Sequence, residues 1–197
     1  MAGYWSSRRE SLYYQAVYKI VAVVGQDATS IIDVGSAETD YIKWFEWIGR
    51  KVQLNRGFRT GLEGVERIGA DFYKWETPEK FDIGLCLQVL EHVTDATEFC
   101  NKLKAISRRL VISVPYKWPA GRHKEHVHDP VDEVKVKSWM GISPNYSLVV
   151  REPFGPARLI CFYDLENGPS FRINVADANR ALRARSQTLG STQQRTS

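Results

Sequence analysis

The chain has 197 residues, of which 43% are hydrophobic and 25% are charged, and its formal net charge is +4. This size and composition favour one soluble globular domain and exclude two domains of ordinary size. No apolar run is long enough to span a bilayer and residues 1–9 contain no apolar signal core, so we expect a cytoplasmic protein without a membrane partner.

The positive charge and the cysteines each favour a simple interpretation. Much of the charge comes from arginines near the C-terminus, and a tail of this kind is more often solvated than bound to nucleic acid. We therefore expect no nucleic-acid partner. The cysteines are widely spaced within apolar runs, which predicts reduced core thiols at Cys86, Cys100 and Cys161. Nothing in the sequence indicates an oligomeric state.

The first quarter of the chain predicts a helix, a strand and a second helix. Apolar residues at helical spacing predict the first helix over residues 9–24, closed by Gly25. The apolar run at 31–34 predicts a buried strand ending at Gly35, a residue that lets the backbone approach a ligand closely. Helical spacing then predicts a second helix, whose inner face carries Tyr41, Phe45 and Ile48.

The remaining apolar runs predict six further strands and two helices. The strands cover residues 51–55, 65–70, 81–87, 109–114, 146–151 and 159–163. Asp95 is the expected N-cap of one helix, and Asp129 with Pro130 predicts the start of another that ends at Gly141. This order predicts an α/β fold with helices on both faces of a doubly wound, mostly parallel seven-stranded sheet. Its last two strands form an antiparallel hairpin.

The domain organisation follows from where the apolar pattern fades. We expect a single domain over residues 1–165, beginning with the N-terminal helix. Residues 166–197 are polar, bear arginines and end in a stretch of low complexity. They are predicted to form a disordered tail.

Three stretches resemble the motifs of one enzyme family. Residues 31–35 (Ile-Ile-Asp-Val-Gly) match its first motif, 70–72 look like its acidic segment after the third strand, and 81–93 resemble its fourth-strand signature. From residue 30 to residue 164, the chain thus resembles the class I S-adenosylmethionine-dependent methyltransferases. The resemblance implies a Rossmann-like fold, S-adenosylmethionine as cofactor, and transfer of a methyl group to an acceptor.

The resemblance also implies roles for single residues. The backbone around Gly35 would face the methionine part of the cofactor, and Asp71 and Phe72 would hold the adenine. Where the family usually has a ribose-binding acid, this chain offers Gln53 or Asn55, whose amides make weaker hydrogen bonds than a carboxylate. The cofactor-binding residues implied in this way are Asp33, Gly35, Ser36, Ala37, Gln53, Asn55, Asp71, Phe72, Gln88 and Val89.

All four histidines are predicted to lie at one edge of the sheet. His92 follows the fourth strand, and His123, His126 and His128 follow the fifth, which should be its neighbour. Three explanations stay open. One is a solvated loop whose histidines have no catalytic role, and another is that His92 or His126 acts as the general base of a methyl transfer. The third explanation is a divalent metal site formed by Glu91, His92, His126 and His128.

The expected function is therefore methyl transfer to a small-molecule acceptor, with a hydroxyl favoured because bases are available. Two alternatives remain. A degenerate, methyltransferase-like binding or scaffold module would explain why the family's repeated glycines are replaced at Ala37 and Thr39. A metal-assisted RNA 2′-O-methyltransferase is suggested because Gln88, Glu91 and His92 resemble the metal-dependent small-RNA enzymes, although glutamine stands where that family has a carboxylate.

Overall fold

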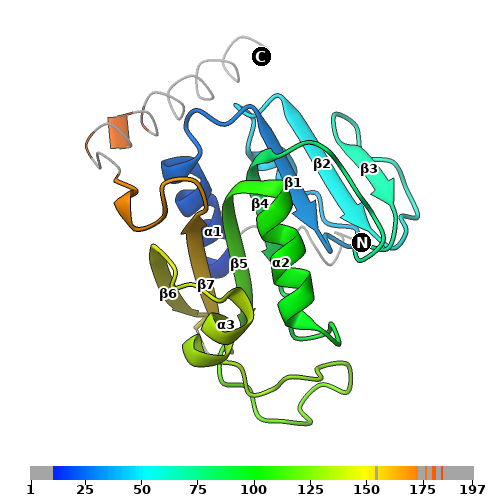
Figure 1. The fold of residues 1–197 in the computed structure, drawn as a ribbon, viewed down its shortest axis with the longest axis vertical. Helices are drawn as coiled ribbons and strands as arrows, with labels where there is room; N and C mark the ends of the chain where they lie inside the picture. Colours follow the sequence, from blue (N-terminus) through cyan, green and yellow to red (C-terminus); the bar gives the residue numbers. More distant parts are fainter. Residues whose placement is uncertain (1–10, 154, 173–175, 177–178, 181–182, 184–197) are drawn as a thin grey trace.

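The structure is a computed structural model that describes residues 11–153, 155–172, 176, 179, 180 and 183. In this part of the chain, seven strands form one sheet in the order β3-β2-β1-β4-β5-β7-β6 (Figure 1). β7 runs antiparallel to β5 and β6, and the other paired strands are parallel. The predicted sheet is confirmed. The strands are β1 (Ser30–Val34), β2 (Arg50–Asn55), β3 (Glu66–Gly69), β4 (Phe81–Leu87), β5 (Ser107–Pro115), β6 (Tyr146–Arg151) and β7 (Ala157–Asp164).

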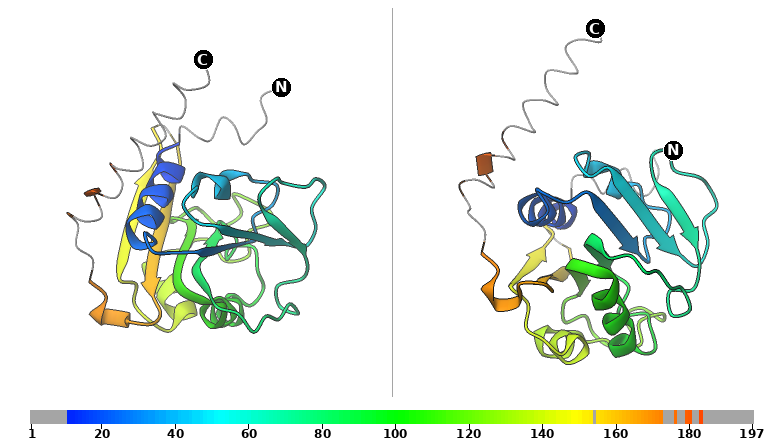
Figure 2. Two further views of the ribbon diagram at one scale, coloured as in Figure 1. Left: turned by 90° about the horizontal axis from the view of Figure 1, so that it is seen from above. Right: turned by 45° about the horizontal axis from the view of Figure 1, so that its top comes forward.

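Helices cover both faces of the sheet, as the sequence predicts (Figure 2). On one face lies α1 (Leu12–Val24), and on the other lie α2 (Ala96–Ile106) and α3 (Glu133–Met140). Ile31 packs in the cluster of α1 whereas Ile32 packs in the cluster of α2, because successive strand residues point to opposite faces. This two-sided burial explains why the central strands are almost continuously apolar.

The segment between β1 and β2 forms only a short 3₁₀-helix, η2 (Tyr41–Trp44). The predicted α-helix is therefore wrong, although Tyr41, Phe45 and Ile48 are buried as expected. The rings of this segment pack against those of α1, and the centroids of Tyr14 and Tyr41 are 5.3 Å apart. These packed rings cover this face of the sheet beside α1 in place of a full helix.

The start of α3 also differs from the prediction. The helix begins at Glu133, and its N-cap is Asp132, whose side chain accepts a hydrogen bond from the Lys135 amide. Asp129 does not cap the helix because its carboxylate contacts His126 instead. Beyond β7 the structure describes a short 3₁₀-helix, η3 (Gly168–Ser170), and most of the tail predicted over 166–197 lies outside the described residues.

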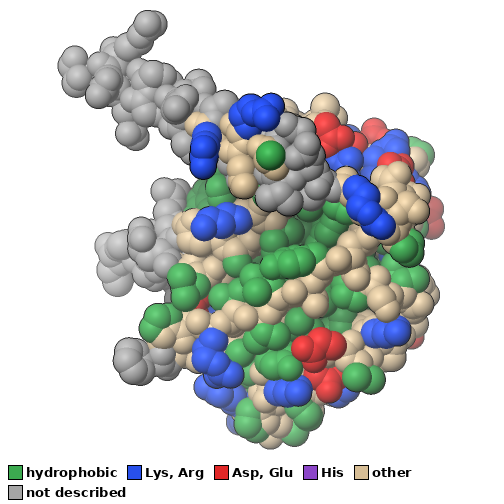
Figure 3. Space-filling model, turned by 90° about the vertical axis from the view of Figure 1, so that its left-hand side faces the viewer, with side chains coloured by type: hydrophobic (Ala, Val, Ile, Leu, Met, Phe, Trp, Pro, Cys, Tyr) green, Lys and Arg blue, Asp and Glu red, His purple; other side chains and the backbone are tan. Residues whose placement is uncertain are grey.

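An apolar groove of about 430 Å³ opens on the face formed by α1 and β6 (Figure 3). Its apolar lining includes Ile20 and Val23 of α1, Tyr146 of β6 and Phe162 of β7. It lies at the start of β6, away from the carboxyl ends of the parallel strands. Within the described residues, no helix has the length and apolar character needed to cross a membrane.

The close packing of β4 against β5 generates a stability prediction. A Cβ added at Gly84 would lie 3.0 Å from the Cβ of Ser107 and 3.2 Å from Cδ1 of Leu110. Both neighbours are fully buried, so we expect Gly84→Ala to lower the free energy of unfolding by about 2 kcal/mol. Denaturant unfolding measures the change. Gly61→Ala, where nothing lies within 4 Å, is the control, and equal stability of the two variants would contradict the packing account.

Candidate functional site

The carboxyl ends of β1 and β4 lie side by side at the centre of the sheet, where the strand order reverses. Open α/β sheets bind their ligands outside such a switch point. A cavity of about 310 Å³ opens here. Its walls come from α1, the turns after β1 and β4, the loop after β5, and the beginning of β7.

The turn after β1 depends on Gly35. Its φ is +81°, in the left-handed region that favours glycine. A Cβ at this position would lie 2.5 Å from Cγ2 of Val89, so the turns after β1 and β4 meet here with no room for a side chain. The predicted residues Asp33, Ser36 and Ala37 line the cavity beside Gly35.

A second cavity, of about 180 Å³, adjoins the first near the ends of β2 and β3. Gly35 and His92 line both cavities, so an elongated ligand can reach from one into the other past this glycine. Besides Gly35, four of the predicted cofactor residues line the second cavity: Asn55, Asp71, Phe72 and Val89. The predicted residue Gln88 lines the first cavity.

Gln53 lies at neither cavity, which corrects its predicted place among the cofactor residues. Its side chain is fully buried, and its Nε2 donates a hydrogen bond of 2.7 Å to the Thr39 carbonyl. Its Oε1 accepts one of 2.9 Å from Nε of Arg67. Because Gln53 stands two residues before the end of β2, it braces the loop after β1, whereas Asn55 at the strand end reaches a cavity.

Asp33 faces the first cavity from the end of β1. It is only 2% exposed, and no described group donates a hydrogen bond to its Oδ1. Burial raises the pKa of this carboxyl to about 7. An unpartnered, buried carboxyl in a cavity wall can accept a hydrogen bond from a ligand, and a cationic ligand would favour its ionised form.

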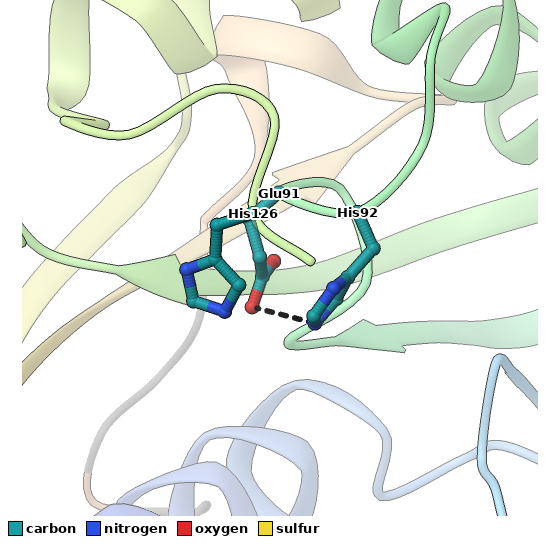
Figure 4. A group of neighbouring side chains, drawn as sticks. All are labelled: Glu91, His92 and His126. Carbon is teal, nitrogen blue, oxygen red and sulfur yellow. Dashed lines mark ion pairs between the residues drawn. The ribbon is translucent and has the colours of Figure 1, made fainter. Parts of the chain in front are cut away.

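Glu91, His92 and His126 converge on the first cavity (Figure 4). One potential metal-ligand atom from each residue lies within 4.8 Å of the others, and Nε2 of His92 is 3.9 Å from Oε1 of Glu91. Oε2 of Glu91 has no hydrogen-bond partner among the described residues. Burial raises the pKa of Glu91 to about 8, and burial lowers the pKa of His92.

His126 is held in one orientation by Asp129. Its Nδ1 lies 2.7 Å from Oδ2 of Asp129, and the two side chains are 7% and 1% exposed. Because an ionised carboxylate can only accept, we assign the proton to Nδ1, which leaves Nε2 as a free base. The ring also stacks on Trp118 and meets His92 edge-on, with centroids 5.7 Å and 4.7 Å away.

The other two histidines take different places. His128 does not join the group predicted as a metal site, because its Nε2 lies 2.7 Å from the Val93 carbonyl and its ring packs against Trp139. His123 lines the cavity and stacks on His126 with centroids 4.9 Å apart. The structure therefore brings His92, His123 and His126 to the cavity and leaves His128 outside it.

Sequence reasoning missed several residues of this site. Tyr13 and Tyr14 of α1, Thr39 of the turn after β1, and Arg158 of β7 line the first cavity. The sequence pattern indicates that the tyrosines are ordinary core residues of an amphipathic helix. It indicates that Arg158 is a polar position in a hairpin at the edge of the sheet. No local signal marks the tyrosines or Arg158, because their place in the site depends on which elements meet at the sheet edge.

Comparisons with known proteins bear on the fold. No family model matches the sequence, and no curated protein matches it. Solved structures do match. The N-methyltransferase NodS from Bradyrhizobium japonicum WM9, in complex with S-adenosylhomocysteine, has a TM-score of 0.61 at 13% identity, over 79% of this chain and 89% of that one. The chain has the fold of the class I methyltransferases.

Two further structures agree with this methyltransferase fold. The 1,6-didemethyltoxoflavin-N1-methyltransferase from Burkholderia thailandensis has a TM-score of 0.61 at 18% identity, over 80% of this chain and 82% of that one. The magnesium protoporphyrin IX methyltransferase from Synechocystis PCC 6803 has a TM-score of 0.57 at 16% identity, over 76% of this chain and 81% of that one. Both were solved with bound S-adenosylhomocysteine. The predicted Rossmann-like fold class is confirmed.

The residues present fit S-adenosylmethionine. The cofactor is elongated, and two adjoining cavities meet at a glycine that leaves no room for a Cβ. Asp33 would face the cationic amino group from the first cavity, and Asp71 with Phe72 would hold the adenine in the second. The unpartnered oxygen of Asp33 is the kind of buried acceptor that such a ligand satisfies.

The Gly35 turn can be tested with a matched pair of variants. Gly35→Ala forces a Cβ into Val89, so we expect the affinity for S-adenosylmethionine to fall by at least about tenfold. Gly64→Ala has a similar left-handed φ of +74° but no atom within 4 Å, so it carries the strain without the clash. Calorimetric titration measures both variants. An equal loss of affinity in the two would show that the contact with Val89 is irrelevant.

The raised pKa of Asp33 generates a pH prediction. The cationic amino group of S-adenosylmethionine favours the ionised carboxylate, whereas the free carboxyl is protonated below about pH 7. We therefore expect affinity to rise, by up to about tenfold per pH unit, as the pH increases toward 7 and then to level off. Titrations across this range measure it. Asp33→Asn should flatten the profile, and an unchanged slope in that variant would assign the dependence to other groups.

Proposed function

We propose that this protein transfers a methyl group from S-adenosylmethionine to a hydroxyl of a small-molecule acceptor. One observation carries the proposal: the cofactor-shaped pair of cavities meets at Gly35, and the larger cavity also contains Glu91, His92 and His126. A methyl donor and a group that accepts a proton would then face the same space. Methyl transfer is a displacement, so positioning and proton removal are the main tasks of the enzyme.

His126 is the better of the two candidate bases. Asp129 holds its Nδ1–H, and its other nitrogen is free to take the proton of the acceptor hydroxyl. The acceptor oxygen then forms a bond to the methyl carbon while the carbon–sulfur bond of the sulfonium breaks, and the neutral thioether leaves. His92 is less suited, because its side chain is 38% exposed to solvent whereas that of His126 is 7% exposed.

The size and composition of the cavity support a small acceptor. A volume of about 310 Å³, lined in part by Tyr13, Tyr14 and Trp118, suits a compact molecule with an apolar face. The cytoplasmic location expected from the sequence also belongs to this proposal. It is supported by the cysteines, all of which are buried and free.

A metal-assisted version of the same transfer is a second candidate, favoured by the grouping of Glu91, His92 and His126. These residues would hold a borderline divalent ion, since one carboxylate and two imidazoles are ligands that such ions accept. When bound, the ion would polarise the acceptor hydroxyl. Gln88, by contrast, contacts the guanidinium of Arg158 rather than offering a carboxylate to the cluster.

Binding and turnover test the function in sequence. We expect calorimetric titration to give dissociation constants near micromolar, about −8 kcal/mol, for S-adenosylmethionine and S-adenosylhomocysteine. We then expect His126→Gln to slow transfer of a labelled methyl group to hydroxylated aromatic acceptors by roughly 10²-fold or more, without loss of cofactor affinity. His128→Gln is the matched control, because His128 lies outside the cavity.

The outcomes separate the candidates. Failure to bind either ligand would contradict the transferase and favour a binding or scaffold module. Loss of activity on chelation, with recovery on adding a divalent ion, would favour the metal-assisted version. Activity that survives chelation and depends on His126 would favour the general base.

A further inference from the structure

Arg158 lines the larger cavity from the beginning of β7. In the sheet register it stands opposite Pro115, the last residue of β5. Its Nε donates a hydrogen bond of 3.2 Å to Oε1 of Gln88, the residue that follows β4. A guanidinium from the antiparallel hairpin thus reaches the carboxyl edge of the parallel strands, where ligands bind.

A chain of contacts fixes this guanidinium in place. Nε2 of Gln88 donates to Oγ of Ser113 at 3.2 Å, and that hydroxyl lies 2.5 Å from the hydroxyl of Tyr13. The guanidinium carbon of Arg158 lies 4.9 Å from the centroid of the Tyr13 ring. All of these partners are neutral, so the contacts orient the positive charge without neutralising it.

Arg158 lacks a carboxylate partner among the described residues. No described aspartate or glutamate lies within 4.0 Å of its nitrogens, and its terminal nitrogens donate no hydrogen bond to a described group. Other shielded arginines of this protein are paired: Arg67 with Glu38 at 2.8 Å, and Arg109 with Asp27. A partly buried guanidinium with free donors is suited to an anionic ligand, which it can bind in bidentate fashion.

The position of this charge points to the acceptor rather than to the cofactor. The contacts of Arg158 are with Gln88, which follows β4, and with Tyr13 of α1. None is with a described residue of the turn after β1, where Gly35 would face the cofactor, so the guanidinium is placed to meet the second ligand of the cavity.

We propose that Arg158 binds an anionic group of the acceptor, which makes the substrate a small hydroxyl compound that carries a carboxylate or a phosphate. The inference rests on the proposed function for the identity of the reacting group. It adds a second anchoring point, which would orient the hydroxyl toward His126. The carboxylate of S-adenosylmethionine has the same chemistry, so the test must separate the two sources.

Small anions probe this site directly. With S-adenosylhomocysteine saturating, we expect calorimetric titration to show that benzoate or phenyl phosphate binds at least tenfold more tightly than the uncharged analogue benzamide. Arg158→Gln should abolish this preference and leave the affinity for S-adenosylhomocysteine within twofold. Arg158→Lys, which keeps the charge but not the planar fork, should retain part of it. Arg151→Gln, an exposed position on β6 outside both cavities, is the matched control.

Two results would overturn the proposal. One is a wild-type protein that binds neither anion more tightly than benzamide. The other is a loss of S-adenosylhomocysteine affinity of more than tenfold in a folded Arg158→Gln protein, which would assign the guanidinium to the cofactor. Thermal unfolding checks the fold of each variant. If the wild type fails to bind S-adenosylhomocysteine, the proposed function fails, and titration of the anions alone still tests Arg158.

Discussion

The site depends on one contact, between the turn after β1 and the turn after β4. Gly35 adopts a left-handed φ there, and Val89 lies so close that no Cβ fits between them. This contact brings together the ends of the two central strands, and both cavities open beside it. The histidines and carboxyls of the larger cavity are thus arranged around the switch point of the sheet, where open α/β sheets bind their ligands.

Burial sets the electrostatics of this site. Asp33 and Glu91 are almost fully buried, and burial raises the pKa of the first to about 7 and of the second to about 8. Near neutral pH, both groups gain or lose a proton at small cost in free energy, whereas Arg158 keeps its charge. The cavity therefore combines carboxyls that can respond to a cation with a fixed positive charge that is suited to an anion.

Much of the fold could be predicted because its signals are local. The bounds of β4 and β6 agree with their apolar runs, and the Asp95 side chain caps α2 as expected. The errors arose where side-chain contacts decided the local structure. Asp129 contacts His126, three residues before it, instead of starting a helix, and the rings of α1 pack against those of the segment after β1 where a full helix was expected. Gln53 had the right chemistry for ribose but lies too deep in the sheet to meet a ligand.

The sequence by itself determined the strands, the helices before β1, after β4 and after β5, the glycine that ends β1 and the gathering of histidines at one edge. Each follows from neighbouring residues or from the alternation of strands and helices. Only the tertiary structure decided that His126 pairs with Asp129 beside Glu91 while His128 turns away, and that Arg158 reaches Gln88 across 70 positions. These pairings depend on how the loop after β5 and the distant strands pack, which local sequence patterns do not determine.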